Sequence, residues 1–209
     1  MIILKSSRQA SDTSFSVDFD SDSMAPSLSV KVLGVTVDRH LAWDAHVTSS
    51  VCRCNMLLVG LARMRSRVPR ETKRMLVEAL VFPHIRYCIS VWGSCCISQQ
   101  KRIQKVVNFG ARIVSGLSRR EHVTPVLREL GWECVSDMVR TSDLAVVSQL
   151  LTSDGAPELL RNKLVLRSDK SVRSTRATVR GQLQLPRVKT EFARRGFLFR
   201  ASKHWNDAL

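Results

Sequence analysis

The chain has 209 residues, and 33 lysines and arginines against 18 acidic residues give it a net charge of +15. An apolar fraction of 44% is ordinary for a globular protein, so we do not expect wholesale disorder. The positive charge limits the choice of partners to nucleic acid, an anionic membrane or an acidic protein. No uncharged run approaches the roughly 18 residues of a membrane-spanning helix, and the first apolar stretch is too short for a signal peptide. We therefore expect no membrane association and an intracellular location, nuclear or cytoplasmic.

The N-terminal part of the chain predicts short strands. Residues 1–29 mix apolar stretches with Ser and Asp, and MIIL and SFSVDFD each favour a strand. The next run, VKVLGVTV from Val30 to Val37, is rich in β-branched residues and predicts a further strand. Gly34 falls inside this run. A glycine in a strand interior marks either a bulge or a close approach of another backbone or a ligand, and both interpretations stay open.

Beyond residue 40 the pattern becomes helical. Apolar residues recur at spacings of three and four from Val47 to Leu61, which predicts an amphipathic helix. Pro83 predicts a kink or break in the second helix. The predicted helices cover residues 41–65, 70–87, 98–116, 123–130, 134–151 and 190–209. We therefore expect a mainly α-helical fold with a small N-terminal antiparallel β element, in one loosely organised domain with a basic C-terminal extension.

The C-terminal segment concentrates the positive charge. Residues 170–203 contain ten lysines or arginines and one acid, a local charge of +9. The first half has little apolar periodicity and is interpreted as a basic loop or weak strand. The closing stretch TEFARRGFLFRASKHWNDAL predicts a helix that is capped by Thr190 and anchored by Phe192, Phe199 and Trp205.

Two groups of residues suggest metal ligands but depart from the usual spacings. Cys52-x-Cys54 and Cys95-Cys96 could supply four thiolates to zinc, yet zinc modules favour two to four intervening residues. The aspartates of DFDSD alternate as in a calcium loop, but its glycine and glutamate positions hold serine. We therefore prefer reduced, buried cysteines and a solvated loop.

Five segments in order resemble one protein family. The stretch KVLGVTVDRHLAWDAHV resembles the pattern K-[FY]-L-G-[VI]-x-[LI]-D-x-x-L-x-W-x-x-H-[VI] of the region after the catalytic core in reverse transcriptases of non-LTR retrotransposons, the jockey-like and related animal elements. LVFPHIRYCISVWG resembles that family's P-x-x-x-Y-x-x-x-x-W-G segment, and IQKVVNFGARIVSG, LRELGW and the closing helix resemble later segments. Each motif alone is weak, but five in the right order over residues 30–209 are specific together. The matching positions in the first two motifs are Lys31, Leu33, Gly34, Val35, Asp38, Leu41, Trp43, His46, Pro83, Tyr87, Trp92 and Gly93.

The resemblance implies a role in holding nucleic acid. In that family Leu-Gly-Val belongs to the primer grip, a hairpin that holds the primer end, and the following helices form the thumb, which tracks the template–primer duplex. It implies remnant palm strands and a primer-grip-like hairpin in residues 1–40, a helical thumb-like domain in 41–152, and a basic extension with a terminal helix in 153–209. For Trp43, Trp92 and Trp205 we prefer core packing to a role in binding. From the resemblance and the clustered charge, the predicted nucleic-acid-binding residues are Lys31, Leu33, Gly34, Val35, Lys101, Arg102, Lys105, Arg112, Arg173, Arg176, Arg180, Arg194 and Arg195.

The catalytic motifs of the family are not present in this sequence. The family holds two metal ions with aspartates, one of them in an aromatic-Ala-Asp-Asp motif, because nearby carboxylates must place the metals about 4 Å apart. The chain contains no Asp-Asp pair. We therefore expect a carboxy-terminal piece of a reverse transcriptase that binds an RNA or DNA template–primer, has no catalytic, cofactor-binding or metal-binding residues of its own, and does not synthesise DNA alone. The parent enzyme would use magnesium, and another chain could supply the missing palm and fingers.

Two other classes of function are kept as alternatives. The first is a structural or protein-interaction module, in which apolar surface that once faced the palm, including Val32, Val35, Val37 and the edge near Ile2, binds a partner. The second is an enzyme of another kind that uses some of the five histidines and six cysteines. It is the least favoured, since no nucleophile motif and no glycine-rich phosphate loop is present.

Overall fold

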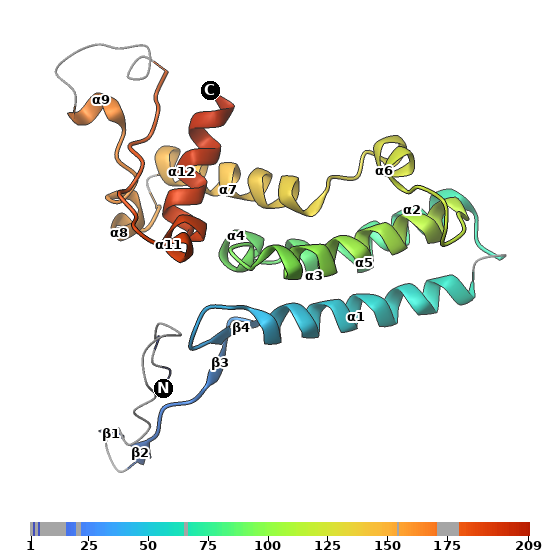
Figure 1. The fold of residues 1–209 in the computed structure, drawn as a ribbon, viewed down its shortest axis with the longest axis horizontal. Coiled ribbons are helices and arrows are strands. Elements are labelled where there is room, and N and C mark those ends of the chain that lie inside the picture. The colour runs from blue at the N-terminus through green and yellow to red at the C-terminus, as the bar shows by residue number, and fades with distance from the viewer. Residues whose placement is uncertain are drawn as a thin grey trace. The chain divides into compact units, whose positions relative to one another are not determined.

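The computed structural model describes residues 2, 4, 16–19, 22–64, 67–153, 155–170 and 180–209 (Figure 1). Short antiparallel pairs, β1 with β2 and β3 with β4, precede a series of helices, so the predicted mainly helical fold with a small β element is confirmed. Within the described residues no helix is both long and apolar enough to cross a membrane. The elements are β1 (Val17–Phe19), β2 (Asp22–Met24), β3 (Ser29–Val32), β4 (Val35–Asp38), α1 (Asp44–Arg63), α2 (Arg70–Leu80), α3 (Phe82–Arg86), α4 (Ile89–Trp92), α5 (Ile97–Ser115), α6 (Thr124–Leu130), α7 (Val135–Thr152), α8 (Glu158–Arg161), α9 (Arg167–Lys170), α11 (Glu191–Arg195) and α12 (Phe197–Ala208).

The chain forms two compact units instead of the single loosely organised domain expected from the sequence. Unit 1 comprises residues 1–87 and 95–132, and unit 2 comprises residues 88–94 and 133–209. The chain enters unit 2 early because α4 packs against α7, which lies some forty residues later in the sequence. The domain boundaries that the resemblance implies, after residues 40 and 152, stay a prediction.

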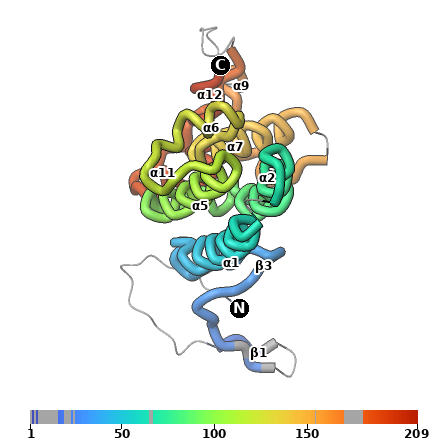
Figure 2. The backbone as a smooth tube through the Cα atoms, turned by 90° about the vertical axis from the view of Figure 1, so that its right-hand side faces the viewer, coloured from blue at the N-terminus to red at the C-terminus, as the bar shows by residue number. Residues whose placement is uncertain are grey.

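In unit 1, α1 runs beside α5, and α2 packs on α5 (Figures 1 and 2). The predicted break at Pro83 is confirmed, since α2 ends at Leu80 and α3 begins at Phe82. A Cβ atom at Gly110 of α5 would lie only 3.1 Å from Val77 Cγ1 of α2, so the glycine lets these helices approach closely. The predicted apolar face of α1 is buried at Val47, Cys54, Leu58 and Leu61.

Trp132 attaches the end of α6 to α2 and α3. Gly131 takes a left-handed conformation after α6, and the following indole is buried. Its ring meets Phe82 edge-on, with ring centroids 4.7 Å apart, and its Nε1 donates to Glu78 Oε1 at 2.8 Å. The LRELGW motif therefore closes one side of the unit 1 core.

Gly34 lies in a turn and not inside a strand, so the prediction of a strand interior was wrong. Val32 pairs with Val35, and the two residues between them, Leu33 and Gly34, have φ of 46° and 85°. Two successive positive φ values in a two-residue loop match the right-handed twist of a β-hairpin. Tyr87 holds this turn, because its hydroxyl donates to Leu33 O at 2.5 Å.

The core of unit 2 gathers around α7 and α12. Leu183 is fully buried in this core, although the sequence interpretation gave its segment only as a basic loop or weak strand. The predicted cap is confirmed, since Thr190 Oγ1 accepts from the N–H of Ala193 at 3.2 Å. Phe192 is 51% exposed and is not an anchor, because the predicted terminal helix is interrupted at Gly196 and α11 carries no buried residue.

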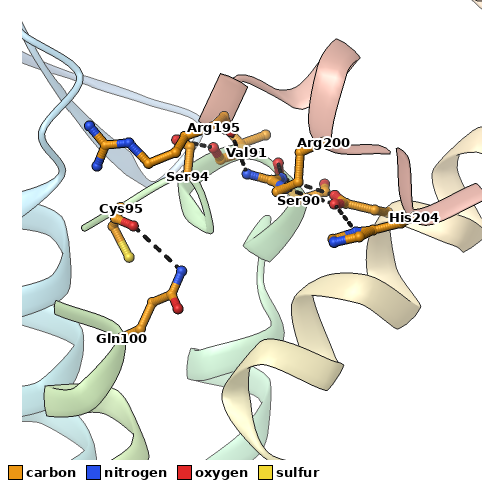
Figure 3. Close-up of polar contacts among 9 residues, drawn as sticks. Ser90, Val91, Ser94, Cys95, Gln100, Arg195, Arg200 and His204 are labelled. Carbon is orange, nitrogen blue, oxygen red and sulfur yellow. Dashed lines mark hydrogen bonds and ion pairs between the residues drawn. The ribbon is translucent and has the colours of Figure 1, made fainter. Parts of the chain in front are cut away.

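A buried ion-pair network joins α12 to α7 and α4. Asp143 is fully buried on α7, and its two oxygens accept from Arg200 Nε at 2.7 Å and from the guanidinium NH2 group at 2.9 Å. His204 Nδ1 lies 2.9 Å from the same carboxylate. Arg200 also donates to the backbone oxygen of Ser90 at 2.6 Å and of Arg195 at 3.0 Å (Figure 3). One guanidinium thus joins three segments of unit 2.

Replacing Gly34 with alanine should destabilise the hairpin by about 1 kcal/mol, because a side chain disfavours the left-handed conformation. A Cβ atom there would meet Tyr87 Cε1 at 3.5 Å, an ordinary contact, so the cost lies in the backbone. Urea unfolding with hydrogen exchange of β3 and β4 measures the effect. Gly60→Ala is the control: it lies inside α1 with open space around it and should stabilise by about 0.5–1 kcal/mol. If Gly34→Ala left the free energy of unfolding unchanged, the assignment of Gly34 to a left-handed turn would be contradicted.

Replacing Asp143 with alanine should destabilise unit 2 by about 3–5 kcal/mol, because it leaves a largely buried guanidinium without its counter-charge. Denaturant unfolding, with hydrogen exchange of α7 and α12 to locate the loss, is the measurement. Glu191→Gln, which removes an exposed ion pair with Arg194 at 3.8 Å, should change little. Equal effects of the two substitutions would show that the buried network contributes nothing.

Candidate nucleic-acid interface

Asp38 fixes the hairpin to the start of α1. Its Oδ1 accepts from the backbone N–H groups of His40 and Ala42, both at 3.0 Å, and its Oδ2 accepts from that of Trp43 at 2.7 Å. Leu41 and Trp43 have φ of 51° and 67°, which is strained for residues with side chains. The carboxylate therefore stabilises a tight connection that the backbone alone would disfavour.

The chemistry of Asp38 follows from this geometry. Partial burial raises the pKa of its carboxyl, but the N–H groups of Ala42, Trp43 and His40 favour the anion and lower the pKa overall. Trp43 is 4% exposed, which confirms its prediction as a core residue.

His46 completes the same set of contacts. Its Nδ1 accepts from the N–H of Thr36 at 3.4 Å, and burial lowers its pKa, so the neutral imidazole is favoured. The D-x-x-L-x-W-x-x-H part of the motif thus acts by positioning the hairpin.

The hairpin places the first group of predicted binding residues together. Lys31 is exposed on β3, and Leu33 at the turn is 86% exposed. Gly34 lies beside the Tyr87 ring, while Val35 is 5% exposed and packs in the core. The hairpin therefore offers a lysine, an apolar tip and turn backbone to a ligand.

Helix α5 carries the second group, and its cations differ in availability. Lys101 and Lys105 are exposed one turn apart, and among the described residues neither has an acidic partner within ion-pair distance. Arg102 donates to Thr48 Oγ1 of α1 at 3.1 Å and to Gln99 Oε1 at 2.7 Å. We call Lys101, Lys105 and Arg112 the α5 cation row.

A pocket of about 720 Å³ opens at the C-terminal end of this row. Arg112 donates to the carbonyl oxygen of Ser118, which holds the loop after α5 against the helix. The sequence interpretation missed Phe109 and Arg119 in this pocket. Phe109 could have been found from helical spacing, but Arg119 comes from a loop that only tertiary structure brings back to α5. The pocket is lined by Ala62, Lys105, Asn108, Phe109, Arg112, Ile113, Leu117, Ser118 and Arg119.

The remaining predicted binding residues belong to unit 2 or lie outside the described residues. Arg180 and Arg194 are exposed, and Arg195 is half-buried on α11. Arg173 and Arg176 fall in the part of the chain that the structure does not describe.

The cysteine pairs do not form a metal centre in the described part of the chain. Cys52 is exposed, whereas Cys54 is buried in the unit 1 core, where burial raises the pKa of its thiol to about 11. Across the described residues, no group of three or more His, Cys, Asp or Glu side chains could hold a metal ion. Among the described residues, no such group is available for the two-metal centre of a polymerase.

Asp38→Ala should lower the stability of unit 1 by about 1–2 kcal/mol at pH 7, because three backbone donors lose a charged acceptor. Since the folded-state pKa lies below the ordinary value, this contribution is present above about pH 4 and is lost as the pH falls through the folded-state pKa. Urea unfolding from pH 7 to pH 2 measures it. Wild type and variant should converge in acid, while the exposed control Glu71→Gln stays near wild type. A gap between wild type and Asp38→Ala that persists in acid would contradict this role.

Comparisons with known proteins give a partial relationship. No protein-family model and no solved structure matches the chain. The chain is 30% identical over 112 residues, 52% of its length, to "Probable RNA-directed DNA polymerase from transposon X-element" of Drosophila melanogaster. It is 27% identical over 112 residues to the corresponding protein "from transposon BS" of the same organism. It spans 12% of the length of each relative. Over about half its length, the chain is thus related to RNA-directed DNA polymerases of Drosophila transposons.

Proposed function

We propose that this chain is the primer-grip, thumb and post-thumb part of a jockey-like retrotransposon reverse transcriptase, and that it binds a template–primer or RNA. The similarity to two transposon polymerases supports the parentage, and the order of the five motifs supports the place within it. The observation that carries the binding role is the α5 cation row, which lies in the same compact unit as the hairpin.

The binding mode proposed is contact with phosphates and little reading of sequence. Lys101 and Lys105 are free to meet phosphates, because no acidic side chain among the described residues neutralises them. The hairpin supplies Lys31 and exposed turn backbone. Phosphate contacts position a protein on nucleic acid without specifying bases, so we propose weak sequence preference.

The chain by itself is proposed not to extend a primer. Phosphoryl transfer by the parent family needs carboxylates that hold two metals, and this sequence has no Asp-Asp pair. A palm supplied by another chain would provide them. Incubation of the purified chain with a primed template, magnesium and nucleotides tests this point, and extension by the chain alone would contradict it.

A second candidate function is a protein-interaction module. Leu28, just before the hairpin, and Val32 and Leu33 on it are 67%, 50% and 86% exposed, which is unusual for large apolar side chains so close together in sequence. Size-exclusion chromatography at high salt separates the two functions. A monodisperse oligomer with no affinity for nucleic acid would favour the interaction module.

The proposed function predicts a steep salt dependence of binding. If about five phosphates are neutralised, log affinity should fall with log salt at a slope of roughly −4. The variant Lys101→Ala with Lys105→Ala should reduce the magnitude of the slope by about 2. Filter binding over a salt series is the measurement, with an arbitrary-sequence duplex and a single strand as ligands.

The matched control for this titration is Arg128→Ala with Lys163→Ala. It removes the same charge from two exposed sites outside the α5 cation row. A slope near zero for the wild type would contradict nucleic-acid binding. Equal loss in the two double variants would contradict a specific role of α5.

A further inference from the structure

We propose that the pocket beside α5 binds one unpaired nucleotide, with the base against Phe109 and the phosphate at Lys105, Arg112 and Arg119. This inference rests on the proposed function but assigns a new site to it. The pocket volume of about 720 Å³ lies within the range of small-molecule sites. Its size suits a single nucleotide and not a duplex, whose bases are stacked and paired.

The lining of the pocket divides into two chemical parts. Phe109, Ile113, Leu117 and Ala62 give an apolar wall that contains an aromatic ring. Every nucleobase has a flat face that stacks on such a ring, whereas an inorganic anion has no planar face to stack. An apolar wall next to cations therefore favours a ligand with both a planar group and a phosphate.

The polar part of the lining offers donors. Lys105, Arg112 and Arg119 are cationic, and no carboxylate is among the lining residues that the structure describes. Asn108 adds an amide whose oxygen accepts from Gln104 Nε2 at 2.9 Å, which directs donation through its NH2 group. A set composed of donors matches phosphate oxygens and base carbonyls.

The part of the wall that comes from the loop after α5 is held in place by its own contacts. Arg112 donates to the carbonyl oxygen of Ser118, and Glu121 accepts from the N–H of Ser118 at 2.7 Å. The N–H and the carbonyl oxygen of Ser118 are therefore both hydrogen-bonded to side chains. Arg119 is the next residue in the chain. These contacts fix one wall of the pocket, which reduces the cost of ordering that wall around a ligand.

Fluorescence anisotropy with three labelled ligands of equal length tests the site: a poly(dT) strand, an abasic strand with the same phosphates, and a blunt duplex. The wild type should bind poly(dT) about tenfold more tightly than the abasic strand, the size of one base–aromatic stacking contact. Phe109→Leu keeps the apolar volume but should abolish the preference for poly(dT), whereas Phe109→Trp, which keeps an aromatic ring, should retain it. Arg119→Glu should weaken the binding of both strands and reduce the magnitude of the slope of log affinity against log salt by about 1.

Arg128→Glu on α6 is the matched control, since it makes the same charge change at an exposed position outside the pocket. Preference for bases that survives in Phe109→Leu, or equal losses for Arg119→Glu and Arg128→Glu, would overturn the pocket while the duplex salt slope still supports the proposed function. Absence of binding to all three ligands would overturn both.

Competition by AMP and by inorganic phosphate distinguishes the source of the nucleotide. In one outcome AMP displaces the strand where phosphate does not, and Phe109→Leu abolishes the displacement. Such a result would show that a free nucleotide also occupies the site. Displacement by neither would assign the site to a nucleotide within a strand. Equal displacement by both would show that only phosphate is recognised and would overturn the role of Phe109.

Discussion

The arrangement of unit 1 depends on three hydrogen bonds, which backbone N–H groups donate to the Asp38 carboxylate. These bonds close a connection in which Leu41 and Trp43 have positive φ, so the charge offsets strain that the chain would otherwise avoid. With the connection closed, Trp43 enters the core and His46 reaches back to β4. The direction of the hairpin relative to α1 is therefore fixed. From the other side, Tyr87 bonds the turn itself, so the exposed tip is held at both its base and its end.

Helix α5 has two separate roles because helical geometry gives it two faces. Its apolar residues recur every three or four positions and pack against α1 and α2, and Gly110 leaves room for Val77 of α2. The same spacing brings Lys101, Lys105 and Arg112 onto one side of the helix, where the two lysines are exposed and Arg112 and Phe109 are half-buried. A mutation on the binding face therefore changes charge without opening the core. This separation is what allows the binding residues of a rigid helix to be tested one at a time.

The local features of the fold were accessible from the sequence, and the features that depend on distant contacts were not. Apolar spacing predicted α1 and α5, and the glycines after α5 and α6 marked their ends. The turn at Gly34 was misjudged because Val30 to Val37 reads as one β-branched run, and only pairing shows that the run is two strands. Arg119 was missed for a similar reason, since no periodicity connects a loop residue to a helix. The division into two units was also beyond local patterns, because α4 packs on a helix that comes much later.

The positive charge of the chain is a poor guide to its binding surface until the partners of each cation are known. Arg200 belongs to the basic C-terminal segment, yet its guanidinium is largely buried against Asp143 and joins three parts of unit 2. Lys101 and Lys105 have no such commitment within the described chain. A cation that already neutralises a buried carboxylate is not available to neutralise a phosphate. Helix α5, although shorter and less basic than residues 170–203, is therefore the better candidate for the interface.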